Sequence, residues 1–209
     1  YIGTTTSVGL EEVNRWFKGD IAKLMMWDRC LDEDEILEFP DDCVAEYDFG
    51  DIKDIVKVVA NESNDYGFQS QINYGVKSSN STYFTFLEYD DELSPIWVKT
   101  AKEYTHHYPE VGVFLPIVYE TDENGKFISF TNESVWAKDF SEVTGYLDNN
   151  VLQRVQNFNF DGMVVKKSDF EEYGQLKSNM KLTFTYEFLL RMTYFSVPVM
   201  VIPKLGYKH

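Results

Sequence analysis

Short apolar runs of strand-like composition alternate along the chain with segments that repeat hydrophobic residues at helical spacing. The runs at 83–87, 111–119 and 198–203 are predicted to be strands, the first of them central in the sheet. Asn124-Gly125 separates the second run from another at 127–130, which is the strongest short-range signal for a β-hairpin. The chain is therefore expected to contain a sheet with at least one hairpin.

Two segments carry clear helix signals. Ser94-Pro95 supplies an N-cap and a first-turn proline, and the helix that follows is expected to end near Tyr108-Pro109. Residues 183–195 place large apolar side chains every three or four positions, as in a helix that buries one side. Because strands and helices alternate, residues 40–209 are predicted to form an α/β domain.

A cluster of acids follows the apolar run at 83–87. Its members are Glu88, Asp90, Asp91 and Glu92. Open α/β sheets bind ligands outside the carboxyl ends of their strands, so a site is expected here. Neighbouring carboxylates repel one another unless a cation or a proton lies between them, and hard divalent ions prefer oxygen ligands. The cluster predicts a metal site; a solvated acidic turn is the alternative.

Residues 1–39 differ in character from the rest of the chain. Residues 17–27 have apolar side chains on both faces, which is typical of a strand covered on both sides. Asp32 and Glu35 have the spacing of a capping box at the start of a short helix. Pro40, followed by two acids, marks the expected boundary. We expect a short β-rich appendage before the α/β domain.

The composition limits the classes of partner and the compartment. A formal net charge of −16 argues against nucleic acid or an anionic membrane as the partner. Two cysteines, Cys30 and Cys43, are too few for a disulfide framework, and no signal peptide or membrane-spanning run is recognisable. A cytoplasmic location is therefore favoured. The first residue, Tyr1, suggests a piece of a longer polypeptide.

The N-terminal segment also carries a family-like phrase. Its positions are Phe17, Gly19, Ile21, Trp27, Arg29, Leu31, Glu35 and Ile36. Together they resemble the closing strand and short acidic helix of laminin-G-like (concanavalin-type) sandwich domains. The resemblance implies that residues 1–39 are the C-terminal remnant of such a sandwich. An ordinary strand and helix belonging to the next domain is the alternative.

Four motifs follow one another within residues 61–209. They are Gly67 with Asn73 and Gly75, then Leu87–Leu93, Asp161–Gly174 and Tyr186–Arg191. Their order and spacing resemble the second half of a GT-A-fold glycosyltransferase of the large inverting family 2 type. The resemblance implies a Rossmann-like GT-A core that moves a sugar from a nucleotide-diphosphate sugar donor to a hydroxyl of a carbohydrate or another acceptor. It also implies inversion and assistance by Mn²⁺ or Mg²⁺.

The resemblance assigns roles to individual residues. Glu88 and Asp90 stand where the family carries the two aspartates of its metal motif, and Asp91 follows them beside the donor. Asn73 and Gly75 match the phrase that adjoins the donor. As residue types, Asn73 and Gly75 are better explained by a turn and by close packing than by catalysis.

Two residues near the C-terminus complete the candidate site. His209 is the expected third metal ligand, as in related folds; a solvent-exposed histidine is the alternative. Glu187 is the candidate general base for the acceptor hydroxyl, and an i,i+4 pair with Arg191 is its alternative. The family carries a Glu-Asp pair on this helix, but here Thr185 departs from that pattern.

A second departure concerns the donor side. The family places a β-α-β unit before its metal motif, whereas no convincing first strand precedes Asp41-Asp42 here. The domain is therefore expected to be incomplete on its N-terminal side. Two other classes stay open: a non-catalytic carbohydrate-binding or adhesion protein whose acids hold Ca²⁺, and a catalytically incomplete fragment. The α/β alternation disfavours the first.

Overall fold

The computed structural model divides the chain into two compact units, residues 1–58 and 59–209. It describes residues 23–26, 45–48, 67–88 and 91–209. In the first unit, strands β1 (Lys23–Met26) and β2 (Ala45–Asp48) pair antiparallel. The positions that resemble a laminin-G-like domain lie outside the described residues, so the division into 1–39 and 40–209 stays a prediction.

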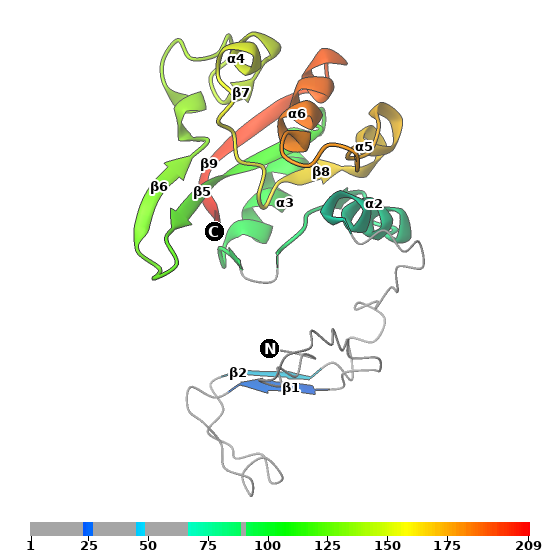
Figure 1. The fold of residues 1–209 in the computed structure, drawn as a ribbon, viewed down its shortest axis with the longest axis vertical. Helices are drawn as coiled ribbons and strands as arrows, with labels where there is room; N and C mark the ends of the chain where they lie inside the picture. Colours follow the sequence, from blue (N-terminus) through cyan, green and yellow to red (C-terminus); the bar gives the residue numbers. More distant parts are fainter. Residues whose placement is uncertain (1–22, 27–44, 49–66, 89–90) are drawn as a thin grey trace, which may run out of the picture. The chain divides into compact units, whose positions relative to one another are not determined.

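The second unit contains one sheet and the helices around it (Figure 1). Its strands are β3 (Tyr83–Phe84), β4 (Glu92–Leu93), β5 (Val113–Thr121), β6 (Phe127–Thr131), β7 (Tyr146–Leu147), β8 (Val164–Lys166) and β9 (Val199–Lys208). Its helices are α2 (Phe68–Ser78), α3 (Trp97–His107), α4 (Asn149–Arg154), α5 (Lys167–Tyr173) and α6 (Phe184–Tyr194), with a 3-10 turn at Glu133–Trp136.

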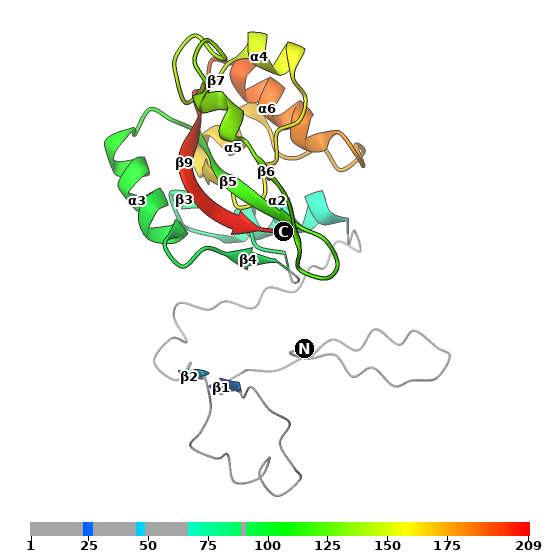
Figure 2. The same cartoon turned by 90° about the vertical axis from the view of Figure 1, so that its left-hand side faces the viewer.

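The sheet is centred on β5 and β9, which run parallel to each other. The strand order is β3-β8-β5-β9-β4, with β6 paired to β5 and β7 paired to β9. The other neighbours pair antiparallel. β9 bends along its length, so its first residues pair with β7 and its last with β4 (Figure 2).

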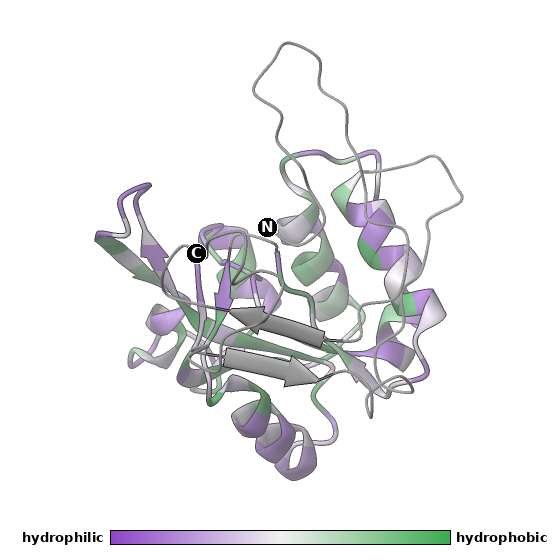
Figure 3. Ribbon diagram, turned by 90° about the horizontal axis from the view of Figure 1, so that it is seen from below, coloured by the Kyte–Doolittle hydropathy of each residue, from purple (hydrophilic) through white to green (hydrophobic). Residues whose placement is uncertain are grey.

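Successive residues of the central strands point to opposite faces of the sheet and fill two cores. Helices α4, α5 and α6 lie on one face and α3 lies on the other (Figure 2). Residues of β5 and β9 in the first core are Val113, Leu115, Val199 and Val201. Those in the second are Phe114, Met200 and Ile202, packed with Trp97 of α3. Figure 3 shows hydrophobic colour along the central strands and hydrophilic colour on the outer sides of the helices.

The predicted central strand at 83–87 was wrong in extent and in position. Only Tyr83–Phe84 is a strand, and within the described sheet it lies at one end of the order. A central strand is buried on both faces, but Thr85 and Leu87 are exposed. Phe86 packs against Phe68 and Phe160, so this part of the chain contributes to a side-chain cluster rather than to the ladder.

Other elements agree with the sequence patterns. The α/β class is confirmed, and so are the helices α3 and α6 and the hairpin of β5 and β6. Asp122 fixes the hairpin turn, because its Oδ1 accepts from the backbone N–H groups of Asn124 and Lys126, both at 2.9 Å. Among the described residues, no helix has the length and apolar character needed to cross a membrane.

Candidate functional site

Tyr207, near the end of β9, contacts the acidic segment (residues 88–92) at Glu88 and at Asp91. The hydroxyl of Tyr207 donates to Oδ2 of Asp91 at 2.7 Å and accepts from the backbone N–H of Glu88 at 3.3 Å. The ring of Tyr207 is fully buried. Burial and the hydrogen bond to Asp91 raise the pKa of the Tyr207 hydroxyl, so it remains protonated and keeps donating. Asp91 and the backbone of Glu88 are thus held by a residue far along the sequence.

His209 contacts the same carboxylate from the other side. Its Nδ1 lies 3.0 Å from Oδ1 of Asp91, and because a carboxylate only accepts, Nδ1 carries the proton. The Asp91 side chain is 3% exposed, while that of His209 is 57% exposed. The hydrogen bond to Asp91 raises the pKa of His209 against the opposing effect of partial burial. The structure therefore brings together two predicted site residues, Asp91 and His209.

A third acid in this region, Asp161, was missed by the sequence analysis. Asp161 is 8% exposed, and burial raises its pKa, although the Asn159 side chain and His209 act in the opposite direction. The negative charge of Asp91 adds to the rise. An Asx turn places Asp161, since its backbone N–H donates to Oδ1 of Asn159 at 2.8 Å. The sequence Asn159-Phe-Asp161-Gly162 was the available signal for this turn.

The loop before β8 is rigidly supported. The buried Asn132 adopts a left-handed conformation (φ 73°), and its amide donates to the carbonyls of Pro116 and Asn159 at 2.8 and 2.7 Å. Gly162 has φ 69°, and a Cβ there would lie 2.6 Å from the ring of Tyr207. Trp97 Nε1 donates to the carbonyl of Gly162 at 2.9 Å. These contacts keep Asp161 beside the end of β9.

The described residues carry donor types that suit a hard divalent cation, namely the carboxylates of Asp91, Asp161 and Glu88 and the imidazole of His209. However, no group of three or more such side chains within the described ranges is arranged to hold a metal ion. Asp90, the principal predicted ligand, lies outside the described residues. The metal roles of Glu88, Asp90 and His209 therefore stay predictions.

Glu187 lies on α6 between two cations. Its carboxylate accepts from Arg191 at 2.8 and 3.1 Å and pairs with Lys177 at 2.7 Å. Burial alone would raise the pKa of Glu187, but the hydrogen bonds from Arg191 and Lys177 lower it below the usual range. Arg191 also donates to the carbonyls of Tyr173 and Gln175. The i,i+4 pair that the sequence left as an alternative is present, and the catalytic role stays a prediction.

Asn73 and Gly75 lie inside α2, so their interpretation as turn and close-packing residues was wrong. The Asn73 amide donates to the carbonyl of Leu176 at 2.8 Å and accepts from its N–H at 3.0 Å, which joins α2 to the loop after α5. A Cβ at Gly75 would meet nothing within 4 Å. Helical spacing at 68–78 was overlooked because the glycines suggested a turn. Their role in donor binding stays a prediction.

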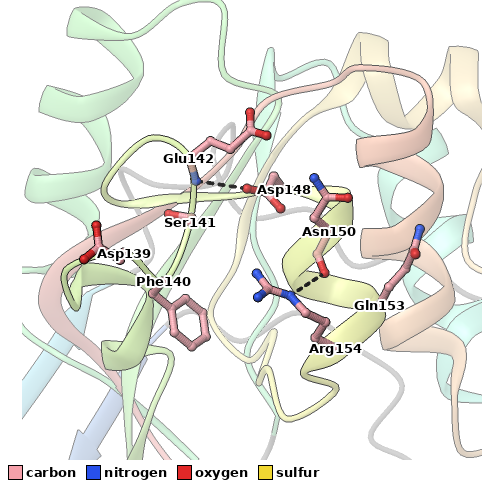
Figure 4. Close-up of a pocket in the computed structure, with 8 residues that line it drawn as sticks. All are labelled: Asp139, Phe140, Ser141, Glu142, Asp148, Asn150, Gln153 and Arg154. Carbon is pink, nitrogen blue, oxygen red and sulfur yellow. Dashed lines mark hydrogen bonds between the residues drawn. The ribbon is translucent and has the colours of Figure 1, made fainter.

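An open hollow of about 650 Å³ lies elsewhere, between the 139–142 loop and α4. Phe140 and Arg154 contribute to its walls (Figure 4). Asp148 joins the two segments, because its carboxylate accepts from the N–H groups of Val151 and Glu142 at 2.8 and 3.2 Å. None of the predicted site residues lines this hollow.

Comparison with known proteins assigns the chain to a family. The profile of Glycosyl transferase family 2 matches residues 41–174, which is more than half of the chain. The chain belongs to glycosyl transferase family 2. The match includes the acidic segment and the loop that carries Asp161. The resemblance stated from the four motifs is therefore confirmed for the glycosyltransferase part; the laminin-G-like part stays a prediction.

Solved structures with the same fold include S. aureus TarS. TarS 1-349 aligns with a TM-score of 0.52 and 15% sequence identity over 73% of this family 2 chain and 42% of the TarS chain. TarS 1-349 in complex with UDP-GlcNAc aligns with a TM-score of 0.52 and 15% identity over 73% and 41% of the two chains. This chain thus spans less than half the length of these TarS chains. The likeness supports the GT-A fold alone. No curated protein matches the chain in sequence.

Proposed function

We propose that this family 2 chain transfers a sugar from a nucleotide-diphosphate sugar to a hydroxyl of a carbohydrate or another acceptor, with inversion at the anomeric carbon. The observation that carries the proposal is the acidic segment held against the end of β9 in a chain of this family. Asp91 and Asp161 are both buried there, and the imidazole of His209 pairs with Asp91 and acts electrostatically on Asp161. Two buried carboxylates attract a cation and repel an anion such as a diphosphate. An anion therefore binds at this site when a metal ion lies between it and the carboxylates.

A divalent ion, Mn²⁺ or Mg²⁺, is part of the proposal. Glu88, Asp90 and His209 are its proposed ligands, with Asp91 beside the donor. When bound, the ion supplies positive charge for the diphosphate that leaves the sugar. Tyr207 and His209 keep Asp91 oriented meanwhile, since they engage its two carboxylate oxygens. Asn73 and Gly75 are proposed to border the donor through α2.

The acceptor hydroxyl needs a base on the side opposite the leaving group, and Glu187 is the proposed base. Its lowered pKa keeps it ionised near neutral pH, and Arg191 orients it through two N–H groups. Lys177 is 48% exposed, so it is the partner that an acceptor hydroxyl would replace. The proton of the hydroxyl then passes to the Glu187 carboxylate as the glycosidic bond forms.

Binding of a nucleotide sugar without transfer is the second candidate function. The observation that favours it is the full engagement of Glu187 by two cationic side chains. Thr185 also stands where the family carries an acid, so α6 offers no second carboxylate in that register. Under this second function, the protein binds the nucleotide sugar at the donor site but has no general base for the acceptor hydroxyl.

Calorimetry with Mn²⁺ and UDP-GlcNAc tests the proposal, using the full-length protein, Asp90→Asn and a control, Glu123→Gln, in the β5–β6 turn. We expect the wild type and the control to bind Mn²⁺ more tightly when UDP-GlcNAc is present, and Asp90→Asn to lose about 10²-fold in affinity. Equal, negligible heats for all three proteins would reject the donor site. Release of UDP then separates transfer from binding alone.

A further inference from the structure

One hydroxyl group holds both flanks of the acidic segment. Tyr207 Oη is within hydrogen-bond distance of the Asp91 carboxylate at 2.7 Å and of the Glu88 backbone N–H at 3.3 Å. Glu88 and Asp91 flank positions 89 and 90 in the sequence, of which Asp90 belongs to the acidic cluster. A tyrosine hydroxyl donates one hydrogen and accepts through its lone pairs, so both contacts form at once.

The ring that carries this hydroxyl cannot move easily. Tyr207 is fully buried, and a Cβ on Gly162 would lie 2.6 Å from its Cδ2, which shows how closely the backbone of Gly162 packs against the ring. The backbone of Tyr207 pairs with Leu93 of β4. The indole N–H of Trp97 donates to the carbonyl of Gly162, the residue that packs against the ring of Tyr207. The position of the hydroxyl is thus set by packing on one side and by the strand ladder on the other.

Neighbouring residues of β9 reinforce the same attachment. The carbonyl of Gly206 accepts from the N–H of Ser94 at 2.9 Å, and Lys208 Nζ lies 3.1 Å from Oε1 of Glu92. One of these contacts involves Glu92, the last member of the acidic cluster, and the other involves Ser94 after it, whereas the hydroxyl of Tyr207 reaches back to Glu88. Tyr207 therefore contacts the residues on both sides of positions 89 and 90, and His209 adds a second contact to Asp91.

We propose that Tyr207 is a positioning residue of the donor site, which holds Glu88 and Asp91 in the arrangement that binds a metal ion and a nucleoside diphosphate. The inference rests on the proposed function, since it assigns Tyr207 a part in that site. Groups that orient metal ligands without touching the metal commonly change affinity by about 10–100-fold when they are removed. Tyr207 acts through Asp91 and the Glu88 backbone and does not itself contact the reacting atoms.

The test compares Tyr207→Phe with Tyr186→Phe in the full-length protein. Phenylalanine keeps the buried ring at position 207 and removes only the hydroxyl. Tyr186 is the matched control, because its hydroxyl donates to the carbonyl of Leu152 at 2.8 Å and is also partly buried. Two quantities are measured: the affinity for UDP in the presence of Mn²⁺, and hydrogen exchange of the peptide that spans residues 85–93.

We expect Tyr207→Phe to weaken UDP binding by about 10-fold or more and to speed exchange in this peptide, with Tyr186→Phe changing neither. Wild-type affinity in Tyr207→Phe would overturn the positioning role even if exchange were faster. Unchanged exchange in the peptide would overturn the anchoring itself. Failure of the wild type to bind UDP and Mn²⁺ would reject the proposed function and, with it, this role; the exchange result would still report the anchoring separately.

Discussion

Asp91 and Glu187 are both largely buried carboxylates with two partners, yet their surroundings differ in charge. Glu187 pairs with Arg191 and Lys177, so its negative charge is compensated within the protein. Asp91 has a neutral tyrosine and a histidine as partners, and Asp161 adds a second buried acid nearby. The negative charge at the end of β9 is therefore less fully compensated than that of Glu187 on α6. A carboxylate site is a candidate for a cation where the protein leaves its charge unmatched.

The largest expected effect is on turnover, and it comes from removing the carboxylate of Glu187, whose charge is compensated by two cations. Glu187→Gln removes the proposed base and should lower kcat about 10²-fold, because a glutamine cannot take the proton of the acceptor hydroxyl. The measurement is steady-state release of UDP by the full-length protein. Glu171→Gln is the control, since it removes another i,i+4 contact, that with Lys167 at 3.5 Å. Unchanged turnover in Glu187→Gln would leave Glu187 as a structural partner of Arg191.

A smaller effect, on stability and on metal binding, is expected from neutralising Asp161, the second buried acid at the end of β9. Because the pKa of Asp161 is raised by burial, the folded state loses stability as the pH rises past the unfolded pKa, and the loss is complete above the folded pKa. Asp161→Asn should therefore stabilise the fold at pH 7 by about 0.5–1 kcal/mol, while it weakens Mn²⁺ binding. Urea unfolding at pH 7 and pH 4 checks the sign. A lower stability at pH 7 would contradict this account of the charge.

Lys177→Met tests the comparison of Glu187 with Asp91, because it removes one of the two cationic partners of Glu187. Lys177 is 48% exposed, so solvent screening should limit the loss of stability to about 0.5 kcal/mol. The pKa of Glu187 should rise, because Lys177 helps to lower it. The acid limb of the kcat profile should then move to higher pH. A limb that stays at the wild-type pH would show that Glu187 does not govern turnover.

The smallest expected effect is the change in stability when His209 is replaced. Its pKa is raised by the hydrogen bond to Asp91, so its contribution to stability is complete below the unfolded pKa and is lost as the pH rises through the folded value. Because His209 is 57% exposed, we expect less than about 0.5 kcal/mol. Thermal unfolding of wild type and His209→Gln from pH 5.5 to pH 8.5 measures it. The difference between the two proteins should shrink as the pH rises.

Local signals predicted the elements that depend on neighbouring residues. The hairpin of β5 and β6 follows from Asn124-Gly125. The helix α3 was predicted, but its N-cap is Ile96 and not Ser94, so it begins two residues later than Ser94-Pro95 indicated. The helix at 183–195 was predicted within a residue at each end. In each case the decisive contacts are a few residues apart, so periodicity and turn chemistry were sufficient.

Elements that depend on distant pairing could not be predicted in the same way. The strand at 198–203 continues to Lys208 because its last residues pair with both β5 and β4, and Tyr207 meets Asp91 across 116 positions of sequence. The run at 83–87 has strand-like composition, but Phe86 is drawn into an aromatic cluster. Of the candidate site, Asp91 and His209 were each predicted as site residues and are in contact, whereas Asp161 depends on a turn whose support comes from Asn132.

The parallel pairing of β5 with β9 has a consequence for how the chain folds. The middle of the sheet joins two segments that are far apart in sequence, so loop closure opposes this pairing until the intervening helices are in place. The hairpin of β5 and β6 can form early, with one side of β5 left unpaired until β9 arrives. Pulsed hydrogen exchange during refolding should therefore protect the β6 amides before those of β9. Until β9 arrives, the vacant side of β5 is an edge open to pairing with other chains, so aggregation during synthesis should fall as soon as β9 is complete.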